Sequence, residues 1–139
     1  MNVLPVYLDT SAIVKLVVEE PESDALLAAL DAWPDRVSST LASVELHRAL
    51  TRATVAPAVR RRAENVLSGI VLLRLDDAIV GKAAELKDRQ LRALDALHLA
   101  SALSLGDYPD AFITYDERLA RAASSAGLAV VHPGAPRLS

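Results

Sequence analysis

Short apolar runs alternate with longer amphipathic segments along the chain, and this alternation limits the possible fold more than any other feature. The runs typical of strands cover residues 3–8, 36–38, 70–75, 111–114 and 128–131. Strands that alternate with helices form parallel sheets covered by helices on both faces. The 139 residues suit one such unit. We therefore predict a single α/β domain over residues 1–139, with a central parallel β-sheet flanked by helices on both faces.

The same pattern predicts several local features. The strand at 70–75 is apolar at nearly every residue, which is typical of a strand buried on both faces. Ser23 is expected to cap one helix, and Asp76 or Asp77 to cap another that runs to about residue 90. The helices near 40–53 and 57–69 should form an antiparallel hairpin.

Two of the predicted strands end on an aspartate. Asp9 follows the first strand in VYLDTSAIV, and Asp116 follows the strand at 111–114 in FITYDERLA. In a doubly wound sheet, ligands bind beyond the carboxyl ends of the strands. Both aspartates are therefore candidate site residues. Either one is also suited to cap the helix that follows it, and capping alone is the alternative for each.

Two further acids lie where apolar residues are expected. Glu45 is on the side of its helix that should face the core. Asp95 stands near the start of the most apolar helix of the chain, in LDALHLASALSL. An ion pair with His47 or Arg48, or partial exposure, would explain Glu45, and an N-cap position would explain Asp95.

If these four acids converge in one crevice, their chemistry predicts a metal site. Carboxylates held together in partly desolvated surroundings repel one another, and they either bind protons or recruit a cation. The chain has no cysteine, and oxygen ligands favour Mg²⁺ or Mn²⁺ over Zn²⁺. The hydroxyls of Ser11 and Thr114 are expected to orient the carboxylates. Because such sites most often serve phosphate chemistry, we expect a phosphodiester substrate.

Charge is unevenly distributed along the chain. The net charge of −3 disfavours a nucleic-acid partner, but residues 46–63 contain five arginines and no acid. A solvated helix surface would explain this block, and contacts with nucleic-acid phosphates are the functional hypothesis. The candidate RNA-binding residues are Arg48, Arg52, Arg60, Arg61 and Arg62.

Four segments, taken in order, resemble a known family. VYLDTSAIVKL, ASVELHRAL, LDALHLASAL and FITYDERLARAA together are similar to a PIN-domain ribonuclease, specifically the VapC-type toxin of a VapBC toxin–antitoxin pair. The resemblance covers essentially the whole chain. It implies a PIN-like fold and endonucleolytic cleavage of RNA to a 5′-phosphate and a 3′-hydroxyl. It also implies a homodimer, a cognate VapB-type antitoxin that blocks the cleft, and Mg²⁺ or Mn²⁺ bound by Asp9, Glu45, Asp95 and Asp116.

Some positions depart from this family or allow a second interpretation. Leu119 stands where relatives often carry an aromatic residue. The fourth acid of the family varies in position, so Glu117 is a reserve candidate beside Asp116. His98 lies one turn after Asp95, and on so apolar a helix we interpret it as a hydrogen-bonded core histidine rather than a ligand.

Two other classes of protein also gather acids at strand ends. A metal-dependent adhesion module carries a D-x-S-x-S pattern, but Ile13 replaces its second serine. A phospho-acceptor signalling domain needs a late lysine at a strand end, and the chain has none after its last predicted strand. The apolar run AIVKLVV is too short to span a bilayer, and no leader pattern is present, so a cytoplasmic location without a membrane partner is expected.

Overall fold

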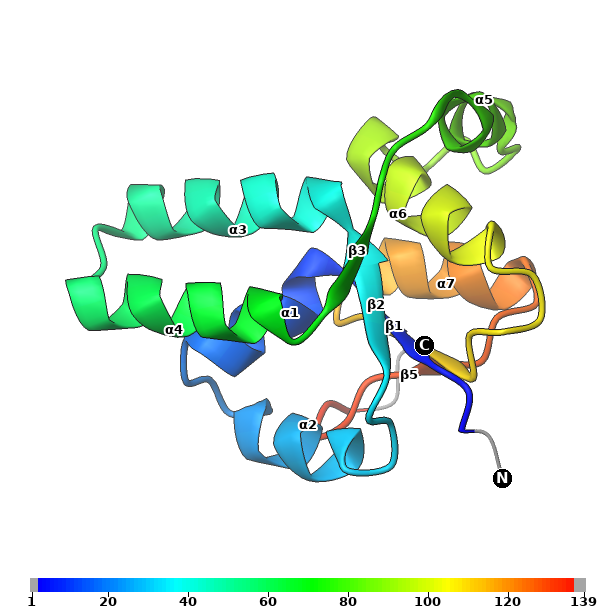
Figure 1. Ribbon diagram of the computed structural model, residues 1–139. Coiled ribbons are helices and arrows are strands. Elements are labelled where there is room, and N and C mark those ends of the chain that lie inside the picture. Colours follow the sequence, from blue (N-terminus) through cyan, green and yellow to red (C-terminus); the bar gives the residue numbers. More distant parts are fainter. Residues whose placement is uncertain (1–2, 137–139) are drawn as a thin grey trace.

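The computed structural model describes residues 3–136, and these residues form one five-stranded sheet between two layers of helices (Figure 1). The elements are β1 (Val6–Leu8), α1 (Thr10–Val17), α2 (Ser23–Leu30), β2 (Arg36–Ser39), α3 (Thr40–Ala53), α4 (Pro57–Ser68), β3 (Val71–Leu73), α5 (Asp77–Glu85), α6 (Ala93–Leu103), β4 (Ala111–Ile113), α7 (Glu117–Ser125) and β5 (Val130–Val131). The strand order is β3-β2-β1-β4-β5, and every pair of neighbours is parallel. The predicted fold class is confirmed.

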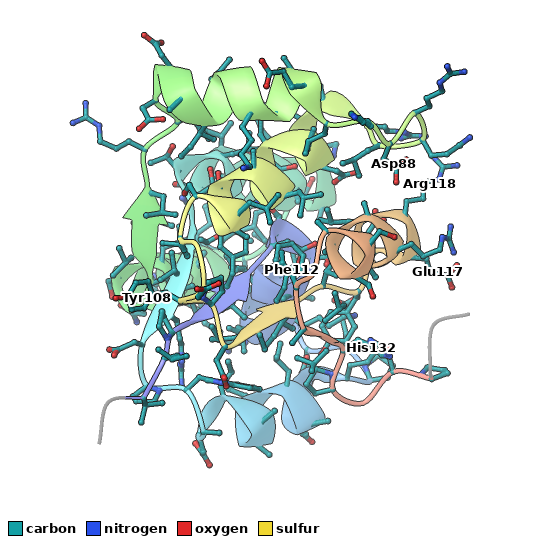
Figure 2. All side chains as sticks on the ribbon, turned by 90° about the vertical axis from the view of Figure 1, so that its right-hand side faces the viewer. Asp88, Tyr108, Phe112, Glu117, Arg118 and His132 are labelled. Carbon is teal, nitrogen blue, oxygen red and sulfur yellow. The ribbon has the colours of Figure 1, made fainter. Side chains whose placement is uncertain are left out.

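Alternate residues of the central strand β1 face the two helix layers. Val6 and Leu8 belong to the hydrophobic core shared with α1–α4, whereas Tyr7 belongs to the core shared with α6 and α7. This follows from the two-residue period of a strand. Tyr7 also stacks on Phe112 of β4, which lies in the interior of the molecule (Figure 2), with ring centroids 5.2 Å apart. Figure 1 shows α1–α4 on one side of the sheet and α5–α7 on the other, with α5 outermost against α6.

Three helices begin where the three central strands end. Asp9 caps α1 directly after β1, Ser39 caps α3 directly after β2, and Asp116 caps α7 shortly after β4. The amino end of a helix carries a partial positive charge, which stabilises nearby anions. This edge of the sheet therefore favours negatively charged side chains electrostatically, before any partner binds.

The strand predicted at 70–75 is shorter and more exposed than expected. β3 covers only Val71–Leu73 and forms one edge of the sheet. Val71 is 62% exposed. The prediction of burial on both faces is wrong. Its apolar content identifies a strand but not the strand's place in the sheet, because that place depends on pairing with distant segments.

Other local predictions have mixed outcomes. Asp76 caps α5, because its carboxylate accepts a hydrogen bond from the backbone amide of Ile79, but α5 ends at Glu85 rather than near residue 90. Ser23 is the first residue of α2 and not its cap, since its hydroxyl donates to the carbonyl of Lys15. The helices α3 and α4 lie side by side as the predicted hairpin (Figure 1).

Leu119, where the resemblance predicts an aromatic residue, is fully buried in the core shared by α6 and α7. Within residues 3–136, no helix has both the length and the apolar character needed to cross a lipid bilayer.

Candidate active site

Asp9 is the most firmly held of the four candidate acids. One oxygen of its carboxylate accepts hydrogen bonds from the amide of Ala12 (3.0 Å) and the hydroxyl of Ser11 (2.7 Å), and the other accepts from the hydroxyl of Thr114 (2.6 Å). Only 3% of the residue is exposed. Burial raises the pKa of Asp9 above its usual value, although these hydrogen bonds act in the opposite direction. Asp9 therefore caps α1 and is also a desolvated carboxylate.

The hydroxyls of Ser11 and Thr114 connect the turn after β1 to the turn after β4. Ser11 accepts a hydrogen bond from the amide of Tyr115, and Thr114 accepts one from the amide of Asp116. Both hydroxyls donate to Asp9, and each makes one bond between the two turns: Ser11 through its acceptor and Thr114 through its donor. These bonds set the position of the Asp9 carboxylate relative to Asp116, more than a hundred residues away in the chain.

Glu45 on α3 is held by two side chains that sequence reasoning did not place in the site. Its Oε1 atom accepts a hydrogen bond from the Thr10 hydroxyl (2.5 Å) and lies 2.8 Å from Nε2 of His98. The alternative of an ion pair with His47 or Arg48 is wrong, because the partner is His98 and His47 pairs with Glu64. The alternative of partial exposure is correct, since 25% of the Glu45 side chain is exposed. Burial acts to raise the pKa of Glu45, but the bonds from His98 and Thr10 outweigh it and lower that pKa.

His98 joins Glu45 to the core. The ring is buried, and its Nδ1 atom lies 2.9 Å from the hydroxyl of Tyr7. With Nε2–H donating to the carboxylate, Nδ1 is the acceptor for the Tyr7 hydroxyl. His98 is a buried, hydrogen-bonded histidine, as interpreted from the sequence, but it also orients one of the candidate acids. No sequence signal pairs it with Glu45, since 53 positions separate them.

Asp95 and Asp116 form the open part of the acid cluster. Asp95 stands in the first turn of α6 and is not the cap of that helix, because Arg92 occupies the N-cap position. Burial raises the pKa of Asp95, and the negative charges of the other three acids raise it further. Asp95 lines the same pocket as Asp116. Thr114 bonds to both Asp116 and Asp9, and Thr10, next to Asp9, bonds to Glu45. These contacts place the four acids at one edge of the sheet. Asp116 caps α7 by accepting a hydrogen bond from the amide of Leu119.

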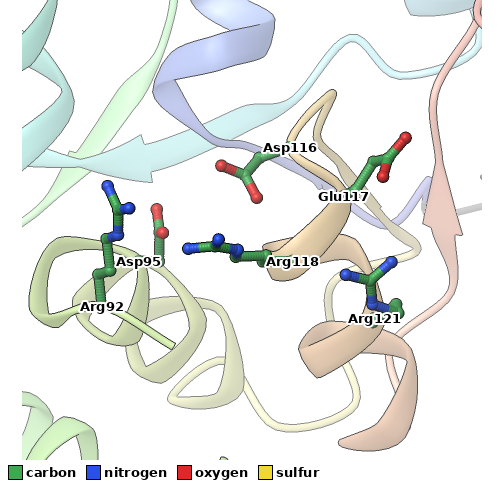
Figure 3. Close-up of a pocket in the computed structure, with 6 residues that line it drawn as sticks. All are labelled: Arg92, Asp95, Asp116, Glu117, Arg118 and Arg121. Atoms are coloured by element: carbon green, nitrogen blue, oxygen red, sulfur yellow. The ribbon is translucent and has the colours of Figure 1, made fainter. Parts of the chain in front are cut away.

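A pocket of about 360 Å³ opens beside Asp95 and Asp116. Figure 3 shows Asp116 pointing toward Asp95, whereas the reserve candidate Glu117 points away from it. The pocket is lined by Arg92, Asp95, Asp116, Glu117, Arg118 and Arg121. The site therefore has a hydrogen-bonded part, made by Asp9 and Glu45, and an open part, made by Asp95 and Asp116, that a ligand can reach.

The family model described as PIN domain matches residues 6–124. The chain belongs to the PIN-domain family, in its VapC branch. Ribonuclease VapC46 of Mycobacterium tuberculosis is 44% identical over 128 residues, covering 92% of this chain and 97% of the relative. Ribonuclease VapC47 of the same species is 38% identical over 136 residues, covering 95% and 99%.

Solved structures share the architecture of this PIN domain. The crystal structure of Mycobacterium tuberculosis VapC20, a Sarcin-Ricin loop cleaving toxin, aligns with a TM-score of 0.70 at 19% identity and covers 92% of this chain and 99% of that chain. VapBC2 from Rickettsia felis, bound to a DNA fragment from its promoter, aligns with a TM-score of 0.74 at 14% identity, covering 94% and 99%. At these identities the likeness concerns the fold.

The donor set of this PIN domain suits a hard divalent cation. All four acids supply oxygen, and the raised pKa values of Asp9 and Asp95 report unfavourable burial of negative charge, which a cation would relieve. Within residues 3–136, no three Asp, Glu or His side chains are already arranged to hold one ion. Binding would therefore have to draw the carboxylates together, most readily those of the open part.

The arginines proposed from the sequence lie on the α3–α4 hairpin of the PIN domain. Arg60 donates to the hydroxyl of Thr51, and Arg62 donates to the carbonyl of Val17, so both already have partners within the chain. The pocket beside Asp95 and Asp116 is lined by other arginines, among them Arg92 and Arg118, which sequence reasoning missed. Their only sequence signal was proximity to the acids, since Arg92 precedes Asp95 by three positions and Arg118 follows Asp116 by two.

Proposed function

We propose that this protein is an endoribonuclease and the toxin of a type II toxin–antitoxin pair. The observation that carries the proposal is the convergence of four carboxylates at the edge of a PIN domain, in a chain 44% identical to Ribonuclease VapC46. The proposed ligands of Mg²⁺ or Mn²⁺ are Asp9, Glu45, Asp95 and Asp116. The metal, when bound, supplies an activated water and neutralises charge on the phosphate.

The side chains of the chain itself have distinct tasks in this reaction. Asp9 is held by Ser11 and Thr114, and Glu45 by Thr10 and His98, so these two carboxylates keep their orientation before substrate arrives. Asp95 and Asp116 face the pocket, where the phosphodiester would enter.

The reaction is a hydrolysis whose products follow from the bond that breaks. The oxygen of water bonds to phosphorus, and the bond from phosphorus to the 3′ oxygen breaks. The leaving 3′ oxygen takes up a proton, which gives a 3′-hydroxyl and a 5′-phosphate. Because water is the nucleophile, the reaction does not need the 2′-hydroxyl of the RNA.

The proposed partners follow from this assignment. They are RNA, a cognate VapB-type antitoxin and a second copy of the chain, with action in the cytoplasm, where cellular RNA is available. Support for the antitoxin comes from structural neighbours that are themselves toxin–antitoxin assemblies, such as a complex from Klebsiella pneumoniae (TM-score 0.68, 21% identity). The antitoxin should restore the growth of cells that express this protein.

The decisive experiment measures metal binding and RNA cleavage in parallel. Mg²⁺ or Mn²⁺ should raise the melting temperature, because a ligand at a hundredfold excess over its Kd stabilises the native state by about 2.7 kcal/mol. Cleavage of single-stranded RNA should stop in EDTA and return when metal is added. Full cleavage in EDTA, without any thermal shift at millimolar metal, would remove the metal from the proposal.

A further inference from the structure

Two arginines lie beside the acid cluster and line the pocket next to Asp95 and Asp116. Arg92 is the N-cap residue of α6, and Arg118 lies in the first turn of α7. Figure 3 shows the guanidinium group of Arg118 reaching from α7 toward Asp95, with Arg92 on the other side of that carboxylate. Both arginines are exposed, and neither forms a hydrogen bond or salt bridge within residues 3–136. Their donors are therefore available to a ligand.

The charges of the pocket explain why such donors are needed. Four carboxylates repel the negatively charged backbone of a nucleic acid, and a bound divalent cation offsets only part of that charge. A substrate phosphate beside the cluster therefore needs cationic groups that the acids do not already occupy. A guanidinium group suits this task, because its planar fork can donate two parallel hydrogen bonds to one phosphate.

The volume and the lining of the pocket agree with a nucleotide-sized ligand. Its volume of about 360 Å³ falls at the lower end of the range for small-ligand pockets, roughly 300–1,000 Å³. Its lining is polar and carries both signs of charge, with Arg92 and Arg118 on either side of Asp95 (Figure 3). Such a lining suits an anion whose phosphate faces the arginines.

The geometry points to a phosphate-binding site, formed by Arg92 and Arg118, that holds a backbone phosphate of the RNA beside Asp95. This inference rests on the proposed function and deepens it, because it places the strand across the α6–α7 side of the acid cluster. The arginines of the α3–α4 hairpin are then not required to hold the reacting phosphate.

The test uses Arg92→Gln, Arg118→Gln and the double variant, each in the full chain. Arg74→Gln is the matched control, since Arg74 is exposed, loses the same charge and lies in the loop after β3, outside this pocket. Binding of a short single-stranded RNA is measured in EDTA over a series of salt concentrations, and cleavage is measured separately with Mn²⁺.

Each pocket substitution should weaken RNA binding about tenfold, the loss expected for a charge-assisted hydrogen bond. The slope of log K against log salt should decrease by about 0.7 for each phosphate contact removed from a single strand. The control should match the wild type in both quantities. In the cleavage assay, KM should rise more than kcat falls, because a phosphate contact is already made in the ground state.

The outcomes separate this inference from the function on which it rests. If wild-type protein cleaves RNA and both pocket variants bind RNA with wild-type affinity and slope, the phosphate site is wrong and the proposed function stands. If the variants lose an acidic protein partner but keep RNA binding, the pair is a protein-docking site, and the inference is again wrong. If the wild type neither binds nor cleaves RNA with Mn²⁺ present, the proposed function itself fails.

Discussion

The two parts of the acid cluster differ in how the fold holds them. Asp9 receives hydrogen bonds from hydroxyl and amide groups, and Glu45 receives them from a hydroxyl and from the imidazole of His98, which ties it to the core. Asp95 has no hydrogen-bond partner for its side chain among the described residues, and Asp116 has only its capping bond. The first pair is pre-oriented and the second is adjustable. In the proposed reaction we expect Asp9 and Glu45 to set the place of the ion, and Asp95 and Asp116 to adapt to ion and substrate.

The largest expected effects come from removing one charge from each part, with Asp9→Asn and Asp95→Asn. Each variant should reduce metal-dependent RNA cleavage by about 100-fold or more, because several kcal/mol of charge stabilisation are lost with a metal ligand. Both should remain folded, since asparagine caps α1 about as well as Asp9 does and Asp95 is not the cap of its helix. The measurements are single-turnover cleavage and circular dichroism.

The same pair of variants also sharpens the comparison. Without metal, Asp95→Asn should be as stable as the wild type or more so, whereas Asp9→Asn should gain less, because two hydroxyls now donate to that carboxylate. Near wild-type cleavage by either variant would remove that residue from the proposed ligand set.

The next largest effect concerns His98 as a positioning residue for Glu45. His98→Leu leaves the Glu45 carboxylate without its imidazole partner and should weaken metal binding by about 10- to 100-fold, the usual cost of removing a group that orients a ligand. Isothermal titration with Mn²⁺ measures this affinity, and thermal unfolding measures the accompanying loss of stability.

Tyr7→Phe is the matched control, because it removes the hydroxyl bonded to Nδ1 of His98 while keeping the ring stacked on Phe112. It should lower stability by about 1 kcal/mol and change metal affinity much less. Equal metal affinities in all three proteins would mean that Glu45 does not depend on His98.

Thr114→Val should mainly affect stability. The substitution keeps the shape of the side chain but removes the donor to one oxygen of the buried Asp9 carboxylate. Loss of that bond should cost about 1–3 kcal/mol, as for other buried groups left unsatisfied. Denaturant unfolding in EDTA measures the change. Thr51→Val is the control, at an exposed position on α3, and should lower the free energy of unfolding by less than about 0.5 kcal/mol. Equal losses at the two positions would contradict a special role for Thr114.

The smallest effect is a pH dependence of metal-free stability. The pKa of Asp95 is raised in the native state, so the native state binds more protons than the unfolded state, and ionised Asp95 destabilises the fold. At pH 7, Asp95→Asn should therefore be more stable than the wild type, by on the order of 1 kcal/mol or less after solvent screening.

This difference should shrink as the pH falls through the raised pKa and disappear near pH 4, where the aspartate of the unfolded chain also becomes protonated. Paired thermal unfolding of the two proteins from pH 8 to pH 4 checks the trend. A difference that is constant over this range would mean that the charge of Asp95 does not cause it.

Several features of the fold could be predicted because their causes are local. The caps formed by Asp9, Asp76 and Asp116 were expected from a strand or turn followed by a helical pattern, and each accepts the expected amide hydrogen bond. The order of strands and helices follows from the same short-range patterns and implies a parallel sheet. Capping is confirmed for Asp9 and Asp116, and their role as metal ligands stays a prediction.

Other features could not be predicted, because they depend on which distant segments meet. The exposure of Val71 follows from the edge position of β3. The residues of a strand do not determine its position in the sheet, because that position depends on which other strands pair with it. Likewise, the arginines predicted to bind RNA lie close together in the sequence, on α3 and α4. The arginines beside the acids, Arg92 and Arg118, come from separate helices, and only the fold brings them to one pocket.

The sequence by itself determined the alternation of strands and helices in this protein and the helix caps at Asp9, Asp76 and Asp116, because hydrophobic period and capping act over a few residues. The tertiary structure alone decided the partners of those acids. Thr10 and His98 reach Glu45, and Thr114 reaches Asp9, because the parallel order of β2, β1 and β4 brings three strand ends to one edge. The physical reason is that hydrogen bonds depend on distance in space, and that distance is set by the order of the strands.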